Sequence, residues 1–304
     1  MTWDVLGLGA VAVDDLVYLP HFPAPDTKVL VQNEQRQGGG LTGTALVAAA
    51  RLGARTAYFG VLGTDDLSRY TIAELEREGV DCAPVLIHPD AGPVHSTIIV
   101  DTSNGQRTIL HSHAHVQQRG PHEVGEEFIS CCKVLFVDYT VCASASRACQ
   151  AARQLGIPTV GDLEGAVSPE TVELAGLLDH LIINLAYAAR LTGRNDPEET
   201  VRVLDADRRT CVVVTNGARG GWWRDNHGPV RHYAAYTVPV VDTTGCGDVF
   251  HGVYAACLAR CEPLPRTLQL ASAAAALKAT RPGGRTGCPT WVELTQFLTE
   301  YGIS

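Results

Sequence analysis

Short apolar runs alternate with segments of helical composition along most of this chain. The apolar runs are continuous rather than alternating, which is typical of strands that are buried on both faces. Strands of this kind separated by helices predict a three-layer α/β/α fold around a mostly parallel sheet. The predicted strands are residues 134–138, 159–162, 181–184 and 211–215, and the predicted helices are residues 143–155, 169–175, 186–191 and 197–205.

The N-terminal third has a different pattern, with more β-rich segments and fewer helices. Residues 5–13 predict a first strand that ends near Asp14, and residues 27–34 are extended and loosely alternating. Two further runs, 96–100 and 107–111, are joined by a Ser-Asn-Gly turn that favours a hairpin. We therefore expect a small β lid beside the main domain. The predicted core is 1–13, 36–92 and 113–304, and the predicted lid is 14–35 and 93–112.

A strand–turn–helix pattern near residue 245 has the features of an anion site. Residues 237–241 predict an extended segment, and the alanine-rich run that starts at 249 predicts a helix. Gly245 and Gly247 flank Cys246, so the backbone can turn tightly and expose successive N–H groups at the helix start. Asp248 then stands in the first helical turn. It is either a helix cap or a general base beside a phosphate-sized site.

The run Asp-Thr-Thr-Gly-Cys-Gly-Asp at 242–248 resembles the C-terminal signature of the ribokinase-like (phosphofructokinase B) carbohydrate kinases. The resemblance implies that Asp248 takes a proton from a sugar hydroxyl and that the amides of Gly245, Cys246 and Gly247 form an anion hole. The implied reaction is ATP-dependent phosphorylation of a hydroxymethyl-type hydroxyl of a sugar or sugar derivative. The implied cofactors are ATP and Mg²⁺, the ion being held mainly by phosphates and water, without a protein metal site.

Two N-terminal segments are similar to sugar-binding motifs of the same family. Residues 9–14 fit a Gly-x-x-x-x-Asp pattern, and residues 39–44 fit the N-terminal signature, with Thr44 where many members carry Asn. His111 ends the second lid strand, where it could contact a substrate. The residues expected to bind substrate are Asp14, Lys28, Gly39, Gly40, Thr44 and His111.

His111, His113 and His115 recur at every second position and would share one face of a strand. A solvated edge, a substrate contact and a metal site all explain this spacing. The metal site is disfavoured because no carboxylate or thiol lies nearby in the sequence.

The nucleotide side is expected at other strand ends. Thr215-x-Gly217-x-x-Gly220 resembles a nucleotide-binding turn, and residues 280–287 resemble the loop beside the adenine. Tyr187 stands where many members carry a Glu that acts on Mg²⁺ through water. Arg281 and Arg285 in the 280–287 loop could equally be surface charges. The residues expected to bind the nucleotide are Asn184, Thr215, Gly217, Gly220, Ser272 and Gly284.

Other functions fit the sequence less well. Gly7-x-Gly9-x-x-Ala12 imitates a dinucleotide-binding motif, but the prolines that follow forbid the helix which that motif requires. A nucleoside kinase of the same fold would want aromatic residues to sandwich a base, and the lid offers only Tyr18 and Phe22. A catalytically silent sugar or nucleotide sensor is the alternative from another class. Within the family, the 242–252 and 280–287 segments look most like the sulfofructose kinase branch.

Composition and charge limit the partners and the cellular compartment that we expect. The 304-residue chain has a net charge of −9, which argues against nucleic acid as a partner, and its apolar runs are too short for a membrane span. The ten cysteines include no CxxC pair, so we expect reduced thiols in a cytoplasmic protein. At the helix start, Cys246 should be the most reactive of them. The family resemblance also implies a homodimer formed through the lid.

Overall fold

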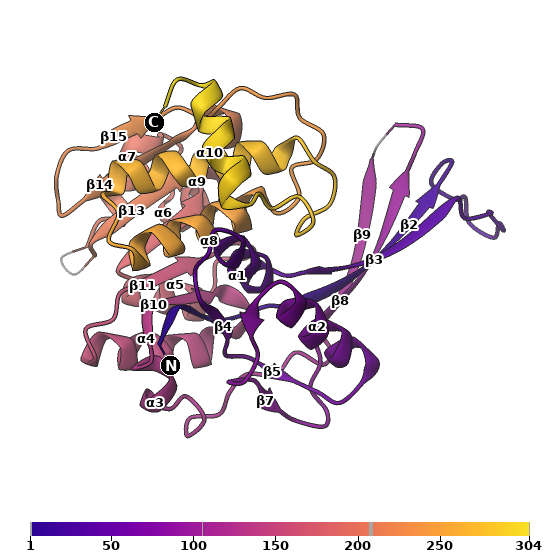
Figure 1. The fold of residues 1–304 in the computed structure, drawn as a ribbon, viewed down its shortest axis with the longest axis horizontal. Coiled ribbons are helices and arrows are strands. Elements are labelled where there is room, and N and C mark those ends of the chain that lie inside the picture. Colours follow the sequence, from indigo (N-terminus) through magenta and orange to yellow (C-terminus); the bar gives the residue numbers. More distant parts are fainter. Residues whose placement is uncertain (1, 105, 207–208, 304) are drawn as a thin grey trace.

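A nine-stranded sheet forms the centre of the protein (Figure 1). The computed structural model describes residues 2–104, 106–206 and 209–303. Strands from β13 to β6 run parallel, and the hairpin β14–β15 extends one edge in antiparallel pairing. In spatial order the strands are β15 (Arg231–Tyr233), β14 (Gly221–Asp225), β13 (Cys211–Thr215), β12 (His180–Asn184), β11 (Thr159–Asp162), β10 (Cys132–Asp138), β1 (Trp3–Leu8), β4 (Thr56–Tyr58) and β6 (Val80–Asp81).

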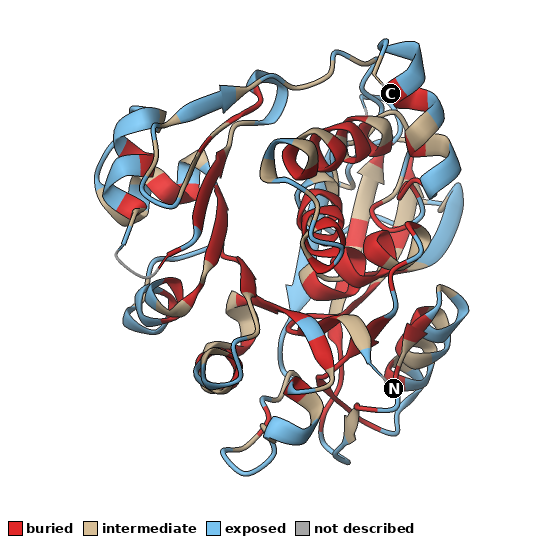
Figure 2. Cartoon of the chain, turned by 60° about the vertical axis from the view of Figure 1, so that its left-hand side comes forward, coloured by how far each residue is buried: buried red, intermediate tan, exposed pale blue. Residues whose placement is uncertain are grey.

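Successive residues of the central strands pack on opposite faces, which explains their continuous apolar runs. In β10, Val134 and Phe136 belong to one buried cluster, whereas Leu135 and Val137 belong to the other. The central strands and the helix faces that pack on them are buried (Figure 2). The predicted three-layer architecture is therefore confirmed. One face is covered by α1 (Leu41–Arg51), α2 (Asp66–Arg77), α8 (Cys246–Ala259), α9 (Leu264–Ala279) and α10 (Trp291–Glu300), and the other by α3 (Glu126–Ile129), α4 (Cys142–Gln154), α5 (Pro169–Leu177), α6 (Leu185–Thr192) and α7 (Pro197–Leu204).

A separate four-stranded sheet projects from the core (Figure 1). Its central strands β2 and β8 pair in parallel, and β3 and β9 flank them in antiparallel pairing. All six residues of β9 are exposed. The strands are β2 (Ala12–Leu19), β3 (Asn33–Gly39), β8 (Val94–Asp101) and β9 (Arg107–Ser112), and a short parallel pair, β5 (Val61–Leu62) and β7 (Leu86–Ile87), lies apart from them.

The predicted first strand is broken in the structure. β1 ends at Leu8, and the chain resumes as β2 in the other sheet, so Asp14 lies inside a strand of the small sheet and not at the rim of the main one. The break occurs where the N–H of Ala10 donates to the Asp138 carboxylate at 2.6 Å. The Ala10 N–H is therefore bonded to a side chain and not to a neighbouring strand, and the parallel pairing of β1 ends before it.

Two other extended segments were also predicted wrongly. The strand expected at 27–34 lies at Asn33–Gly39, because cross-strand pairing with β2, not apolar alternation, defines it. Residues 237–241 form no strand, and Val240 and Val241 are each 62% exposed. Gly105 of the predicted 103–105 turn lies outside the described residues.

Candidate active site

The Gly-x-Gly turn begins α8, as the sequence predicts. Gly245 is the N-cap residue with φ of 75°, a left-handed conformation that favours glycine. The first N–H groups of α8 have no acceptor within the helix. Apart from the neighbouring residues and the backbone of α8 itself, no atom of the described residues lies within 4 Å of the position that a Cβ would take at Gly247. The start of α8 thus lies beside open space, with the N–H of Cys246 donating to the Thr243 carbonyl at 3.2 Å within the turn.

Asp242 stabilises the turn through both its carboxylate and its backbone carbonyl. Its carboxylate accepts the N–H groups of Thr244 and Gly283, both at 2.9 Å, and an N–H of Arg107 at 2.9 Å. Its backbone carbonyl accepts a hydrogen bond from the Lys278 ammonium at 2.7 Å. Burial opposes ionisation, but these hydrogen bonds and Lys278 keep the pKa of Asp242 below its ordinary value. The turn is therefore fixed by charge from α9 and by the 280–287 loop.

Asp248 lies within a group of carboxylates at the carboxyl ends of neighbouring strands. Asp138 and Asp162 end β10 and β11 and are direct neighbours in the sheet register. Burial and then the like charge of Asp162 raise the pKa of Asp248 well above its usual value, whereas His251 opposes this rise. Burial, followed by Glu164 and Asp138, likewise raises the pKa of Asp162. The site therefore contains carboxylates whose ionisation depends on nearby cations.

Asp138 joins this group to the first turn of α1. Its carboxylate accepts hydrogen bonds from the Thr42 hydroxyl at 2.7 Å, from the N–H of Thr140 at 2.9 Å and from the N–H of Ala10. There is no room for a side chain at Gly9, because its Cβ would lie 2.1 Å from this carboxylate. Asp138 consequently holds the segment that follows β1 against the start of α1.

The predicted sugar-binding residues come partly together. Asp14 in β2 lies against Gly39 in β3, where a Cβ would be 2.4 Å from the Asp14 carboxylate. Gly40 is the N-cap of α1 with φ of 87°, and Thr44 is buried in the same helix. Burial raises the pKa of Asp14, although Ser96 lowers it in part. The β2, β3 and α1 residues thus converge at one place.

Two other predicted sugar-binding residues lie further out. Lys28 is exposed in a segment without regular structure, and His111 is exposed in β9. His111 Nδ1 lies 3.0 Å from His113 Nε2. The expectation that His111, His113 and His115 share a strand face is wrong, because β9 ends at Ser112. No group of three metal-ligating side chains occurs in the described part of the chain.

Arg285 is buried, with 3% of its surface exposed, which excludes the surface-charge interpretation. Its Nη2 donates to the carbonyl oxygen of Gly39 at 2.6 Å, and its guanidinium fills the space beside Gly38 and Gly43. Nε and Nη1 have no hydrogen-bond partner among the described residues. Burial lowers the pKa of Arg285, and Asp14 opposes this. Arg285 therefore ties the 280–287 loop to the residues around Gly39.

Two predicted nucleotide-binding residues stand side by side on the main sheet. Asn184 ends β12 and Thr215 ends β13, and they are partners in the strand register. The Asn184 side chain caps α6 by accepting the N–H of Tyr187 at 2.8 Å. The Tyr187 side chain is fully buried in the cluster on the other face of the sheet. Tyr187 therefore does not replace the Glu that many relatives carry.

The remaining predicted nucleotide-binding residues occupy turns and a helix around this rim. Gly217 and Gly220 have φ of 53° and 76°, and Gly220 has no room for a side chain beside the Tyr233 carbonyl. Ser272 is buried in α9. Gly284 approaches Gly245, where a Cβ would lie 3.2 Å from the Gly284 Cα. The 280–287 loop thus packs directly on the Gly-x-Gly turn.

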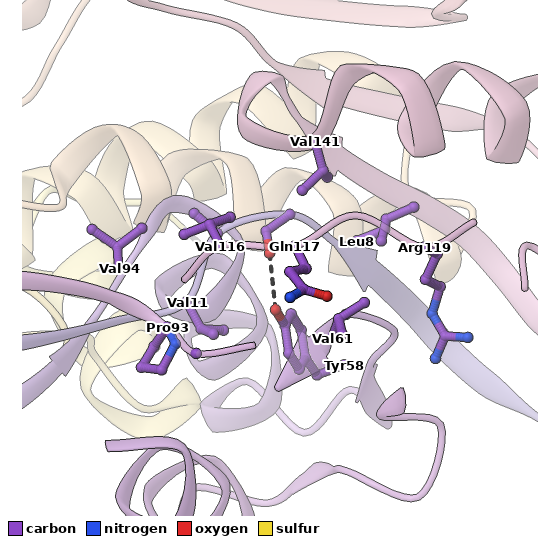
Figure 3. Close-up of a pocket in the computed structure, with 14 residues that line it drawn as sticks. Leu8, Val11, Tyr58, Val61, Pro93, Val94, Val116, Gln117, Arg119 and Val141 are labelled. Carbon is purple, nitrogen blue, oxygen red and sulfur yellow. Dashed lines mark hydrogen bonds between the residues drawn. The ribbon is translucent and has the colours of Figure 1, made fainter. Parts of the chain in front are cut away.

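An interior pocket lies next to residues 9–11, which connect β1 to β2 (Figure 3). Gln117 points into it, and the Tyr58 hydroxyl donates to the carbonyl of Gly9 at 3.0 Å at its edge. The space suits about one water molecule and is too small for a sugar. It borders residues 9–11 and is not the site of chemistry.

The sequence reasoning missed the polar residues that surround Asp248. Asp138 and Asp162 each end an apolar strand, and this signal could have revealed them, since ligands bind at carboxyl ends of parallel strands. The positions of Glu164, His251 and Lys278 gave no comparable signal. His251 and Lys278 are both buried on the helices that pack behind the turn.

The cysteine predictions had mixed outcomes. All ten cysteines are free thiols, and six of them are buried. Burial raises the pKa of Cys246 to about 11, so the expected thiolate at the helix start is not supported. Cys261 is exposed, unlike Cys246.

A model of the pfkB family of carbohydrate kinases matches residues 5–291. The chain belongs to this family. It is 27% identical to a ribokinase of Haemophilus influenzae, over 96% of this chain and 97% of the relative. It is 30% identical to an acarbose 7(IV)-phosphotransferase of Actinoplanes sp., over 93% and 94%. The predicted family and enzyme class, a carbohydrate kinase, are thereby confirmed.

Solved structures agree on the fold. A crystal structure from Agrobacterium tumefaciens that bears a provisional ribokinase name has a TM-score of 0.88 and 30% identity, covering 99% of both chains. Arabidopsis thaliana ribokinase complexed with ribose and ATP has a TM-score of 0.85 and 20% identity, covering 98% of this chain and 99% of the relative. The predicted ribokinase-like fold is confirmed. No described helix is long and apolar enough to cross a membrane.

Proposed function

We propose that this protein transfers the γ-phosphoryl group of ATP to a hydroxymethyl-type hydroxyl of a sugar or sugar derivative. The observation that carries the proposal is the start of α8, where Asp248 stands in the first turn beside the open space at Gly247. Asp248 takes the hydroxyl proton as general base. The amides of Gly245, Cys246 and Gly247 stabilise the charge that develops on the phosphoryl group.

The nucleotide side is proposed along Asn184, Thr215, Gly217 and Gly220, with Ser272 in α9 and Gly284 against the turn. A solved structural relative from E. coli is in complex with ATP and Mg²⁺. Here Mg²⁺ would be held mainly by phosphates and water, and Asp162 and Glu164 offer acceptors for its water ligands. When bound, the ion neutralises charge on the phosphates, while the protein residues orient the reactants.

The sugar is proposed to bind between Asp248 and the group formed by Asp14, Gly39, Gly40 and Thr44, under the small sheet as a lid. Lys28 and His111 would reach it from the lid when the site closes and excludes water. A sulfonated ketose, the substrate class of the sulfofructose kinase branch, is the finer candidate. A homodimer through the exposed strand β9 and a cytoplasmic location, in keeping with the free thiols, complete the proposal.

One experiment tests the reaction and its base together. ATP consumption is measured with ketoses, aldoses, sugar acids, sulfosugars and nucleosides, for the wild type and for Asp248→Asn. The near-isosteric Asn cannot accept the proton, so kcat should fall roughly 10²- to 10⁴-fold while ATP binding changes little. A variant that keeps more than about a tenth of wild-type kcat removes Asp248 from this role. A preference for nucleosides indicates the nucleoside kinase, and no turnover with any acceptor indicates the sensor.

A further inference from the structure

His251 is a buried histidine on α8 whose two ring nitrogens both face oxygen atoms. It lies one helical turn after Gly247 and has 4% of its surface exposed. Nδ1 is 2.7 Å from the carbonyl oxygen of Gly247 and 3.3 Å from Oδ2 of Asp162. Nε2 is 3.0 Å from the carbonyl oxygen of Ile182. The ring is thus held between the backbone of α8, the last residue of β11 and the middle of β12.

These contacts define the number of protons on the ring. A backbone carbonyl only accepts hydrogen bonds, and a neutral imidazole has a single N–H. In either neutral tautomer, one nitrogen lone pair would point at a carbonyl oxygen of Gly247 or Ile182 at hydrogen-bonding distance. With a proton on each nitrogen, both contacts become hydrogen bonds and the positive charge faces Asp162.

The groups around the ring explain what this charge does. Asp162 faces it from β11, Asp248 precedes it on α8, and Glu164 also interacts with it. Asp138 lies beside Asp162 in the sheet register. Burial and these carboxylates together raise the pKa of Asp248, whereas His251 acts in the opposite direction. A general base must be ionised to work, and the buried site otherwise disfavours that state.

We propose that His251 is doubly protonated and is a positioning residue that keeps Asp248 ionised for proton abstraction. The same ring fixes the peptide group between Gly247 and Asp248, whose N–H belongs to the first turn of α8. The inference rests on the proposed function of Asp248. It assigns to this chain a cation that acts through the base and does not itself touch the substrate.

The pH profile of the enzyme tests the electrostatic part. His251→Gln keeps a polar side chain and removes the charge, so Asp248 ionises at higher pH. The acidic limb of kcat against pH should then move upward by about one unit, with kcat about tenfold lower below the limb and little change on the plateau. A merely structural role would lower kcat by the same factor at every pH.

A compensating variant separates charge from structure. Asp162→Asn removes a negative charge beside Asp248, so adding it to His251→Gln should return the limb toward the wild-type position. A limb that stays at the wild-type pH in His251→Gln, while Asp248→Asn is inactive, overturns the inference and leaves the proposed function intact. Full activity of Asp248→Asn would instead overturn the proposed base.

A measurement on the unmodified enzyme covers the case in which a variant does not fold. ¹⁵N-histidine NMR of the wild type at pH 7 should show a directly bonded proton on both ring nitrogens of His251. The residue is assigned through its contacts with the rings of Phe136 and Phe250. A single protonated nitrogen overturns the inference.

Discussion

The two halves of the candidate site are each held by a buried cation, but in different settings. The phosphoryl half, residues 242–248, is fixed by Lys278, which reaches the Asp242 carbonyl from inside α9. The sugar half, made of Asp14, Gly39, Gly40 and Thr44, is fixed by Arg285, which reaches the Gly39 carbonyl from a loop. The first half is part of the main core, whereas β2 and β3 of the second continue into the projecting sheet (Figure 1).

Because of this difference, residues of the two halves differ in how freely they can be substituted. The phosphoryl half consists of backbone amides at a helix start, packed between α1 and α9, and can hardly change without loss of the amide geometry. The sugar half ends in β2 and β3, and the outer residues 33–36 of β3 are exposed and polar, so they can change at little cost to stability. A carbohydrate kinase can therefore alter its substrate through one half and keep its chemistry in the other.

Two glycines on α8 offer the strongest test of the phosphoryl half. Gly247 has open space where a Cβ would be, so Gly247→Ala should fold with unchanged or slightly higher stability, by up to about 1 kcal/mol, because alanine favours a helix. The added methyl would occupy the place proposed for the phosphoryl group, and kcat should fall roughly a hundredfold, as when an oxyanion contact is lost.

Gly252→Ala is the matched control on the same helix. Its Cβ would lie 2.0 Å from the carbonyl oxygen of Ala45, so α1 and α8 must separate and the melting temperature should drop. Thermal melts and steady-state kinetics of both variants distinguish the two effects. If Gly247→Ala keeps wild-type kcat, the open space is not where phosphoryl transfer occurs.

The two buried cations test the comparison itself. Lys278→Met removes the hydrogen bond to the Asp242 carbonyl and so loosens the 242–248 turn. It should lower kcat by about tenfold with little change in the sugar KM. Arg285→Met releases Gly39 and should raise the sugar KM by a similar factor with less effect on kcat. Methionine fills a similar volume without a charge, which limits the cavity left at each site. Equal effects on the same parameter would show that the halves are not independent.

The fold was predictable because its cause is local. Continuous apolar strands such as residues 211–215 specify a two-sided core by themselves, and the structure places β13 at the same residues. The small sheet was less predictable. Its strand β3 is polar and acquires its bounds from pairing with β2, which involves residues distant in the sequence.

The candidate site was predictable only where a backbone pattern encodes it. The turn at Gly245 needs a left-handed residue and therefore leaves a glycine in the sequence. Arg285 and His251 gave no such signal, because a charged residue reads the same in sequence whether it is buried or exposed. Their roles depend on distant partners, Gly39 and Asp162, that only the folded chain brings near them.

Arg107 connects the two halves, since it lies at the start of β9 and contacts both Asp242 and Thr244. Arg107→Ala should uncouple the small sheet from the turn and lower kcat/KM for the sugar about three- to tenfold, as expected for loss of a partly buried charged hydrogen bond. Arg36→Ala, which removes the exposed pair with Asp15 in the same sheet, is the control and should change little. Equal losses in the two variants would contradict a specific bridge.

His111 tests whether the sugar half extends into the small sheet, and its expected effect is the smallest. Thr44 provides a hydroxyl where many relatives have an amide, so another group must satisfy the sugar hydroxyls when water is excluded. The exposed imidazole of His111, beside His113, could donate to a hydroxyl when neutral or pair with an acidic group when protonated. His111→Ala should raise the sugar KM a few-fold and leave the ATP KM unchanged, because only ground-state binding is lost.

His88→Ala, another exposed histidine, is the control. If the sugar KM of His111→Ala equals that of the wild type from pH 6 to 8, His111 is a solvated edge residue and the sugar half ends at the core.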